Sequence, residues 1–262
     1  MPSRAGPTQS DRQPAVVASL GLVTILAWAY VVHVARAPGM SANMAMDMPM
    51  ADMPDMAGPG MASGLSLFAM WVAMMTGMML PAVLPTVLLF RVIARQRAQT
   101  GRAPLSTPAF LAGYLAIWIG FSALAALLQT RLSVTLFEHV TPSRSTTVAA
   151  GVVLLLTGAY QWTAFKASCL AHCRSPIAHF SAHWREGAGG AFRMGLEHGT
   201  LCLACCWLLM GLLFVGGVMN PLWVGGLTLL VLLEKVVPRG DRVGRLAGAG
   251  LIGWGVLLIA RS

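Results

Sequence analysis

Charged side chains are scarce in this sequence of 262 residues. Asp, Glu, Lys and Arg make up only 10% of the chain, whereas 56% of its residues are hydrophobic and its mean hydropathy is +0.70. A soluble domain carries about 25% charged residues. The composition therefore excludes an ordinary soluble domain and indicates an integral membrane protein.

The sequence also lacks the motifs of several common functions. It contains no GxxxxGK[ST] or GxGxxG element, so nothing in it supports nucleotide binding. Its five cysteines are an odd number and fall in two tight groups, which argues against a secreted disulfide framework. Cysteines in this pattern favour a metal-binding or redox role.

Long apolar runs predict an all-α, polytopic bundle of about seven membrane-spanning helices, since a span needs about 20 apolar residues. We divide the chain into an N-terminal tail with a first anchor (1–34), a Met-rich extracytoplasmic linker (35–64) and a six-span metal-binding domain (65–262). A signal peptide cut after Ala37 is the alternative to the anchor, but the run is longer than the roughly 7–15 residues of a signal peptide. The predicted spans are 15–34, 65–90, 108–128, 147–165, 199–218, 221–237 and 244–260.

The basic residues predict how these spans are oriented. If the N-terminus is cytoplasmic, 14 of the 18 Lys and Arg residues fall in inside segments, as the positive-inside rule requires. This orientation accounts for the net charge of +9, so we predict no binding to nucleic acid. We expect a multi-pass protein of the bacterial inner membrane whose C-terminus lies outside.

The linker contains the stretch NMAMDMPMADMPDM, which has no apolar period and is interrupted by Pro and Asp. Thioether sulfur is a soft ligand that suits Cu(I), and no His lies in the tract to favour Cu(II) or Zn. The alternatives are a disordered tether and a sacrificial sink for oxidants. The methionines of this stretch, which we predict to capture metal outside the membrane, are Met44, Met46, Met48, Met50, Met53 and Met56.

A second group of methionines lies within the second predicted span, just before Pro81 and Pro85. Their spacing places all five on one broad helical face. This face could carry a metal ion by thioether exchange, although a stripe of Met is also an ordinary packing or lipid-facing surface. The five residues are Met70, Met74, Met75, Met78 and Met79.

The cysteines occur in KASCLAHCRSP (166–176) and EHGTLCLACCWLLM (197–210), both placed at the cytoplasmic face by the predicted topology. The second stretch puts imidazole, two thiols and a thioether on one helical face at every fourth position. Thiolates with nearby imidazole suit Cu(I) or Zn(II), while buried cysteines acting as small hydrophobes are the alternative. The predicted ligands are Cys169, His172, Cys173, His198, Cys202, Cys205, Cys206 and Met210.

Charged residues near this site carry two further expectations. Lys166, Arg174 and Arg193 are the cations that we expect to favour the thiolate form of the cysteines. Glu234 and Lys235, at the cytoplasmic end of the sixth predicted span, are expected to pair with each other.

Several of these stretches resemble a family of bacterial polytopic proteins described as predicted metal-binding integral membrane proteins. The resemblance covers roughly residues 65–240 and is carried by C-L-x-x-C-R-x-P at Cys169 to Pro176 and by C-x-x-C-C-W-x-L-M at Cys202 to Met210. It implies metal binding without naming a metal. The Met-rich tract lies outside the shared region.

From these observations we predict a non-enzymatic membrane protein that binds and moves or delivers a soft metal, Cu(I) or alternatively Zn. Its expected partners are the lipid bilayer, the metal ion, and either a periplasmic or cytoplasmic metal chaperone or a copper enzyme under assembly. A membrane thiol–disulfide oxidoreductase is the second hypothesis. An assembly or scaffold subunit, with sulfur used only for packing, is the third.

Overall fold

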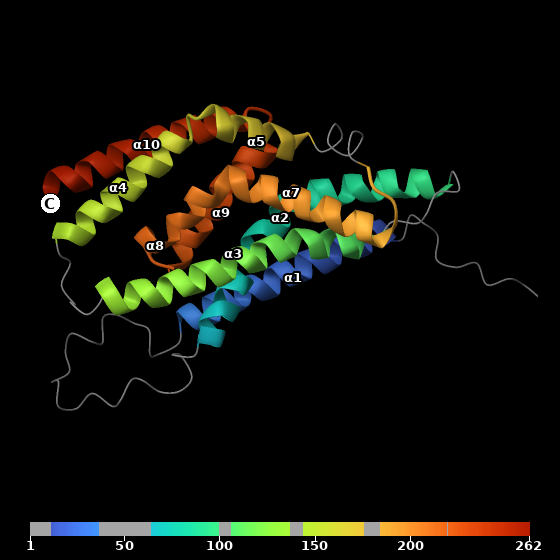
Figure 1. Ribbon diagram of the computed structural model, residues 1–262, viewed down its shortest axis with the longest axis horizontal. Helices are drawn as coiled ribbons and strands as arrows, with labels where there is room; N and C mark the ends of the chain where they lie inside the picture. Colours follow the sequence, from blue (N-terminus) through green and yellow to red (C-terminus); the bar gives the residue numbers. More distant parts are fainter. Residues whose placement is uncertain (1–11, 37–63, 100–105, 137–143, 176–183, 219) are drawn as a thin grey trace, which may run out of the picture.

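The protein is a bundle of α-helices, seen in a computed structural model that describes residues 12–36, 64–99, 106–136, 144–175, 184–218 and 220–262 (Figure 1). Every regular element in these ranges is a helix. The Met-rich stretch 43–56 lies outside them. The helices are α1 (Arg12–Ala35), α2 (Gly64–Gln99), α3 (Thr107–Leu136), α4 (Arg144–Tyr160), α5 (Ala164–Arg174), α7 (Gly187–Gly211), α8 (Leu213–Gly216), α9 (Pro221–Val236) and α10 (Gly240–Arg261).

Five of these helices are long and apolar enough to cross a membrane: α1, α2, α3, α10 and the helix that begins with α7. The pair α4 and α5 makes a sixth span if the two are counted together. The sixth predicted span, 221–237, corresponds to α9, which has only 16 residues. The all-α membrane bundle is thus confirmed, while the number of seven spans stays a prediction.

The predicted fourth span, 147–165, is not one continuous helix. The chain bends by 63° between α4 and α5, and Thr163 caps the start of α5 by accepting a hydrogen bond from the Lys166 amide at 3.2 Å. Beyond the bend, α5 turns toward α7 and α9, as Figure 1 shows. The bend thereby brings the first cysteine group against the second.

Helix α3 packs along α7 at a contact that only glycine allows. A Cβ atom on Gly113 would lie 2.0 Å from the Phe192 carbonyl oxygen, and one on Gly195 would lie 2.0 Å from the Phe110 carbonyl oxygen. Small residues let membrane helices approach this closely. The contact sets the register in which Tyr114 of α3 faces the cysteines of α7.

Helix α2 contributes one of its faces to the centre of the bundle. The five methionines Met70, Met74, Met75, Met78 and Met79 are all buried there, beside Trp71. They belong to the same continuous core as the cysteines of α5 and α7. The Met face is therefore an interior surface and not a lipid-facing one.

Candidate functional site

The site is built on α7, where three cysteines lie close together on a buried stretch of the helix. Cys202, Cys205 and Cys206 each expose about 1% of their surface. The thiol of Cys173, on α5, lies within hydrogen-bonding reach of Cys202 and Cys205. Cys173 and Cys202 are 29 residues apart in sequence, and their two segments thus bring four thiols together.

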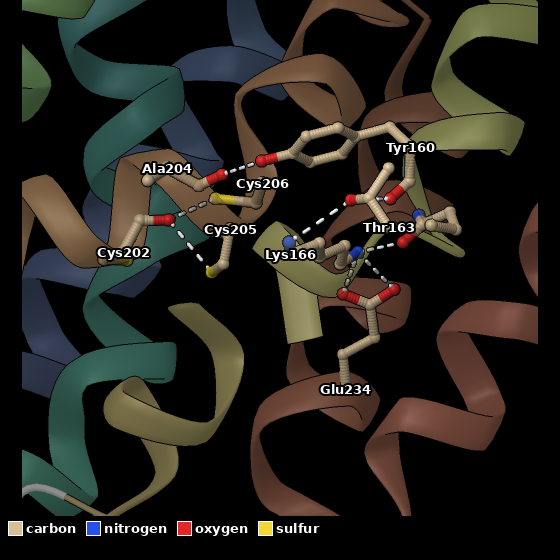
Figure 2. A network of polar contacts seen from close by, with 9 residues as sticks. Tyr160, Thr163, Lys166, Cys202, Ala204, Cys205, Cys206 and Glu234 are labelled. Carbon is tan, nitrogen blue, oxygen red and sulfur yellow. Dashed lines mark hydrogen bonds and ion pairs between the residues drawn. The ribbon is translucent and has the colours of Figure 1, made fainter. Parts of the chain in front are cut away.

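Cys205 and Cys206 turn back along α7 toward a single acceptor. Their thiols donate to the Cys202 carbonyl oxygen at 3.0 and 2.9 Å, and Figure 2 shows both sulfurs converging on it. Residues three and four positions along a helix from a carbonyl lie beside it. The protons of these two thiols are therefore held by the helix itself.

The sulfur of Cys202 has different surroundings. The Lys235 ammonium, at the end of α9, donates to it at 2.7 Å. The Tyr114 hydroxyl lies 3.2 Å from the same sulfur and also donates to the Met79 carbonyl oxygen at 3.3 Å. An ammonium can only donate, so this contact stabilises negative charge on the Cys202 sulfur. Through Tyr114, the sulfur is also joined to the backbone of α2 at Met79.

A cavity of about 530 Å³ reaches this sulfur. Its walls come from α2, α3, α5, α7 and α9, and both Cys173 and Cys202 line it. His198 lines it too, and its ring packs against the rings of Phe110 and Tyr114 at centroid distances of 6.2 and 6.0 Å. The cavity gives a ligand of some size access to two thiols and one imidazole.

A buried ion pair involves Glu234, the residue that precedes Lys235 on α9. Lys166 of α5 donates to both carboxylate oxygens of Glu234, at 2.9 and 2.8 Å (Figure 2). It also donates to the side-chain oxygen of Gln161. The side chains of Lys166 and Glu234 expose only 3% and 2% of their surface. The expectation that Glu234 pairs with Lys235 is therefore wrong.

The cation that directly contacts a thiol is also not one of those predicted, although Arg174 lines the same cavity. Lys166 is bound to Glu234, Arg174 donates to the Val237 carbonyl oxygen at 2.5 Å, and Arg193 lies 3.5 Å from the Glu197 carboxylate. Lys235 takes their place, and Tyr114 was not predicted at all. The LLEK segment identifies Lys235 only as a basic residue at a helix end, so its partner could be found only in three dimensions.

The remaining predicted ligands divide into buried and exposed residues. His198 and Met210 are buried on α7, on the predicted face with Cys202 and Cys206. Cys169 is buried toward Cys205 and Tyr160 but is not among the residues that line the cavity. His172 is exposed, and its Nδ1 hydrogen-bonds the Ser168 carbonyl oxygen at 2.8 Å, so the structure does not bring it to the thiols.

The four thiols do not form a closed metal cage. Within the described ranges, no three His, Cys, Asp or Glu side chains are arranged as a group that could hold a metal ion. The donors nevertheless match a soft cation in kind, because they are neutral or anionic sulfur with one imidazole nearby. Cys173 and Cys202 are the two thiols that share the cavity.

Comparison with known proteins decides which metal is relevant. Residues 68–258 match the model of the PpoB2 family, which is described as copper chaperone. The chain belongs to this family. No curated protein and no solved structure matches it.

The PpoB2 match gives the protein a copper-related role. The match runs to residue 258 and so includes nearly all of α10. The match begins after the Met-rich stretch 43–56 and includes both cysteine groups, Tyr114 and Lys235. The residues around Cys202 thus belong to the part of the chain that defines the PpoB2 family.

Proposed function

We propose that this protein is a non-enzymatic membrane copper chaperone that binds Cu(I) at Cys202 and Cys173 and delivers it to a copper enzyme under assembly. The observation that carries the proposal is the Cys202 sulfur, which faces a cavity and is held by an ammonium 2.7 Å away. A sulfur that bears negative charge is the nucleophile and metal ligand in cysteine chemistry. Membership of the copper chaperone family supports copper as the cargo.

The donor set favours Cu(I) over Zn(II). Structural zinc sites are closed by four ligands in a tetrahedron, whereas two of the four thiols here are turned to the Cys202 carbonyl oxygen. Cu(I) is soft and accepts few sulfur ligands. Cys202 and Cys173 can therefore hold it while Cys205 and Cys206 stay bonded to the Cys202 carbonyl oxygen. An ion held by two sulfurs is also easily passed on, as delivery requires.

The methionines extend this scheme away from the thiols. The helix that carries the buried Met face meets the site through Tyr114, whose hydroxyl contacts the Met79 carbonyl oxygen and the Cys202 sulfur. In our proposal, Met44 to Met56 capture Cu(I) outside the bacterial inner membrane, and Met70 to Met79 pass it inward by thioether exchange. The excess of basic residues in the predicted inside segments supports a cytoplasmic position for the cysteine end.

The test is the copper content of the protein and of single cysteine variants. Each protein is purified anaerobically in detergent, loaded with Cu(I), desalted and analysed by mass spectrometry of the metals. We expect Cys202→Ser and Cys173→Ser to lose most of the bound copper. Cys169→Ser is the matched control, because this thiol is equally buried but does not line the cavity.

The possible outcomes separate the alternatives. Equal copper in the wild type and in Cys202→Ser would contradict the assignment of the site. Zinc in place of copper would retain the site and change the cargo. If no protein binds any metal, thiol–disulfide exchange or a scaffold role becomes the better explanation, and the redox activity of the five thiols is the next measurement.

A further inference from the structure

We propose that the cavity gives the thiols a second source of copper, besides the Met face, and that copper enters by this route as an anionic Cu(I) complex of a small, carboxylate-bearing thiol, not as a bare cation. This inference rests on the proposed function and concerns what the cavity itself recognises. It follows from three properties of the cavity: its charge, its size and the position of its cationic side chains.

The charge of the cavity opposes a bare cation. Arg174 and Lys235 both line it, and no acidic side chain is found among its described lining residues. Walls of one sign and low dielectric concentrate ligands of the opposite sign and repel those of the same sign. A Cu(I) ion without ligands is therefore disfavoured at the entrance to its own site, whereas an anionic copper complex is attracted.

The size of the cavity points the same way. A volume of about 530 Å³ far exceeds what a single metal ion needs and falls among the roughly 300–1,000 Å³ of small-molecule sites. Much of the wall is apolar, from residues such as Val83, Pro85 and Leu89. A cavity of this size and lining accommodates a small organic carrier but not a folded protein domain.

The two cations are placed for different parts of such a carrier. Arg174 lies at the C-terminal end of α5, one residue from the thiol of Cys173, and a guanidinium binds carboxylates through two parallel hydrogen bonds. Lys235 contacts Cys202 with one of its three N–H donors. A carboxylate held at Arg174 leaves the copper-bearing end of the carrier beside the two cavity thiols.

The transfer is a ligand exchange that needs no oxidant or reductant. The Cys202 thiolate forms a bond to Cu(I), and the bond between Cu(I) and the carrier sulfur breaks. The carrier leaves as a thiolate with both electrons of that bond, and copper remains Cu(I). Cys173 then displaces a second carrier thiolate and gives its proton to it.

The experiment compares two Cu(I) donors on the full-length protein in a neutral detergent. Loading is followed anaerobically over time, from the anionic Cu(I)–glutathione complex and from the cationic tetrakis(acetonitrile)copper(I) complex. For the wild type, we expect added salt to slow loading from the first donor and to speed loading from the second, because salt screens attraction and repulsion alike. This readout needs no variant.

Variants then locate the recognition. Arg174→Gln should load about tenfold more slowly from Cu(I)–glutathione, with no loss of rate from the acetonitrile complex. Arg174→Lys keeps the charge but not the two parallel hydrogen bonds, so it should load at an intermediate rate. Leu89→Trp, which fills part of the cavity, should also slow only the glutathione donor. Arg193→Gln, at an exposed cation paired with Glu197 outside the cavity, is the control and should change neither rate.

The outcomes distinguish this inference from the proposed function. Equal slowing of both donors by Arg174→Gln, or the same salt dependence for both donors, overturns the anionic carrier while leaving copper binding intact. Loading from neither donor into the wild type overturns both. Selective slowing with the glutathione donor, together with opposite salt dependences, supports the inference.

Discussion

Lys166 of α5 and Lys235 of α9 both lie near the C-terminal end of α9, but they bind different kinds of partner. Lys166 is closed off with Glu234 and Gln161, and both members of the ion pair are almost fully buried. Lys235 is only partly buried, contacts the Cys202 sulfur and lines a cavity. One lysine has a fixed carboxylate partner, whereas the other contacts a sulfur that, in our proposal, exchanges this cation for copper.

From this difference we expect the first pair to stabilise the fold and the second to serve copper binding. A buried carboxylate and ammonium compensate each other, and neither can leave without stranding the other charge. The Lys235–Cys202 contact can open without such a penalty, because Lys235 also lines the cavity and, in our proposal, copper replaces it at the sulfur. Variants of the two pairs should therefore affect different measurements.

The largest effect on stability is expected from Glu234→Gln. This change leaves the Lys166 ammonium buried without its counter-charge, which costs about 3–5 kcal/mol. We expect the thermal unfolding midpoint in detergent, followed by far-UV circular dichroism, to fall by about 10 °C. Replacing both charges, as in the double variant Lys166→Met/Glu234→Leu, should recover most of this loss. An undiminished midpoint for Glu234→Gln would show that the pair does not hold α5 against α9.

The second variant, Lys235→Met, should show the reverse pattern. Cys202 can become a neutral thiol when its cation is removed, so no charge is stranded and the unfolding midpoint should move by less than about 3 °C. The reactivity of its sulfur should fall about tenfold, because the thiolate is the nucleophile. The measurement is the rate at which iodoacetamide modifies Cys202, read from its peptide by mass spectrometry. Lys235→Arg keeps the positive charge and should retain most of the rate; a wild-type rate in Lys235→Met would contradict the role given to this lysine.

Some of this arrangement follows from the sequence and some does not. The burial of Cys202, Cys206 and Met210 on one face of α7 follows from their spacing, because residues four apart on a helix lie on the same face. The same rule explains the error over Glu234 and Lys235. Adjacent helical residues point in directions about 100° apart, so they do not face each other. Each therefore reaches a partner from another helix.

Tyr114 could not be predicted for a different reason. Its contact with Cys202 depends on how α3 packs against α7, and this packing is set by the close approach at Gly113 and Gly195. Neither glycine stands out in a chain with 28 of them. The bend after Tyr160 was missed as well, because the predicted span 147–165 runs straight through it. Thr163, inside that span, instead caps the start of α5.

The smallest effect is expected from Tyr114→Phe, which tests how much of the site depends on this packing. The change removes one hydroxyl that contacts the Met79 carbonyl oxygen and the Cys202 sulfur, and it should cost about 1 kcal/mol of stability. Tyr160→Phe is a matched control, because its hydroxyl donates to the Ala204 carbonyl oxygen at 2.5 Å and bonds no thiol in the described structure. Both variants should lower the unfolding midpoint by a few degrees, but only Tyr114→Phe should alter the rate at which iodoacetamide modifies Cys202. If the two variants leave that rate equally unchanged, Tyr114 positions the helices and Lys235 alone governs the sulfur.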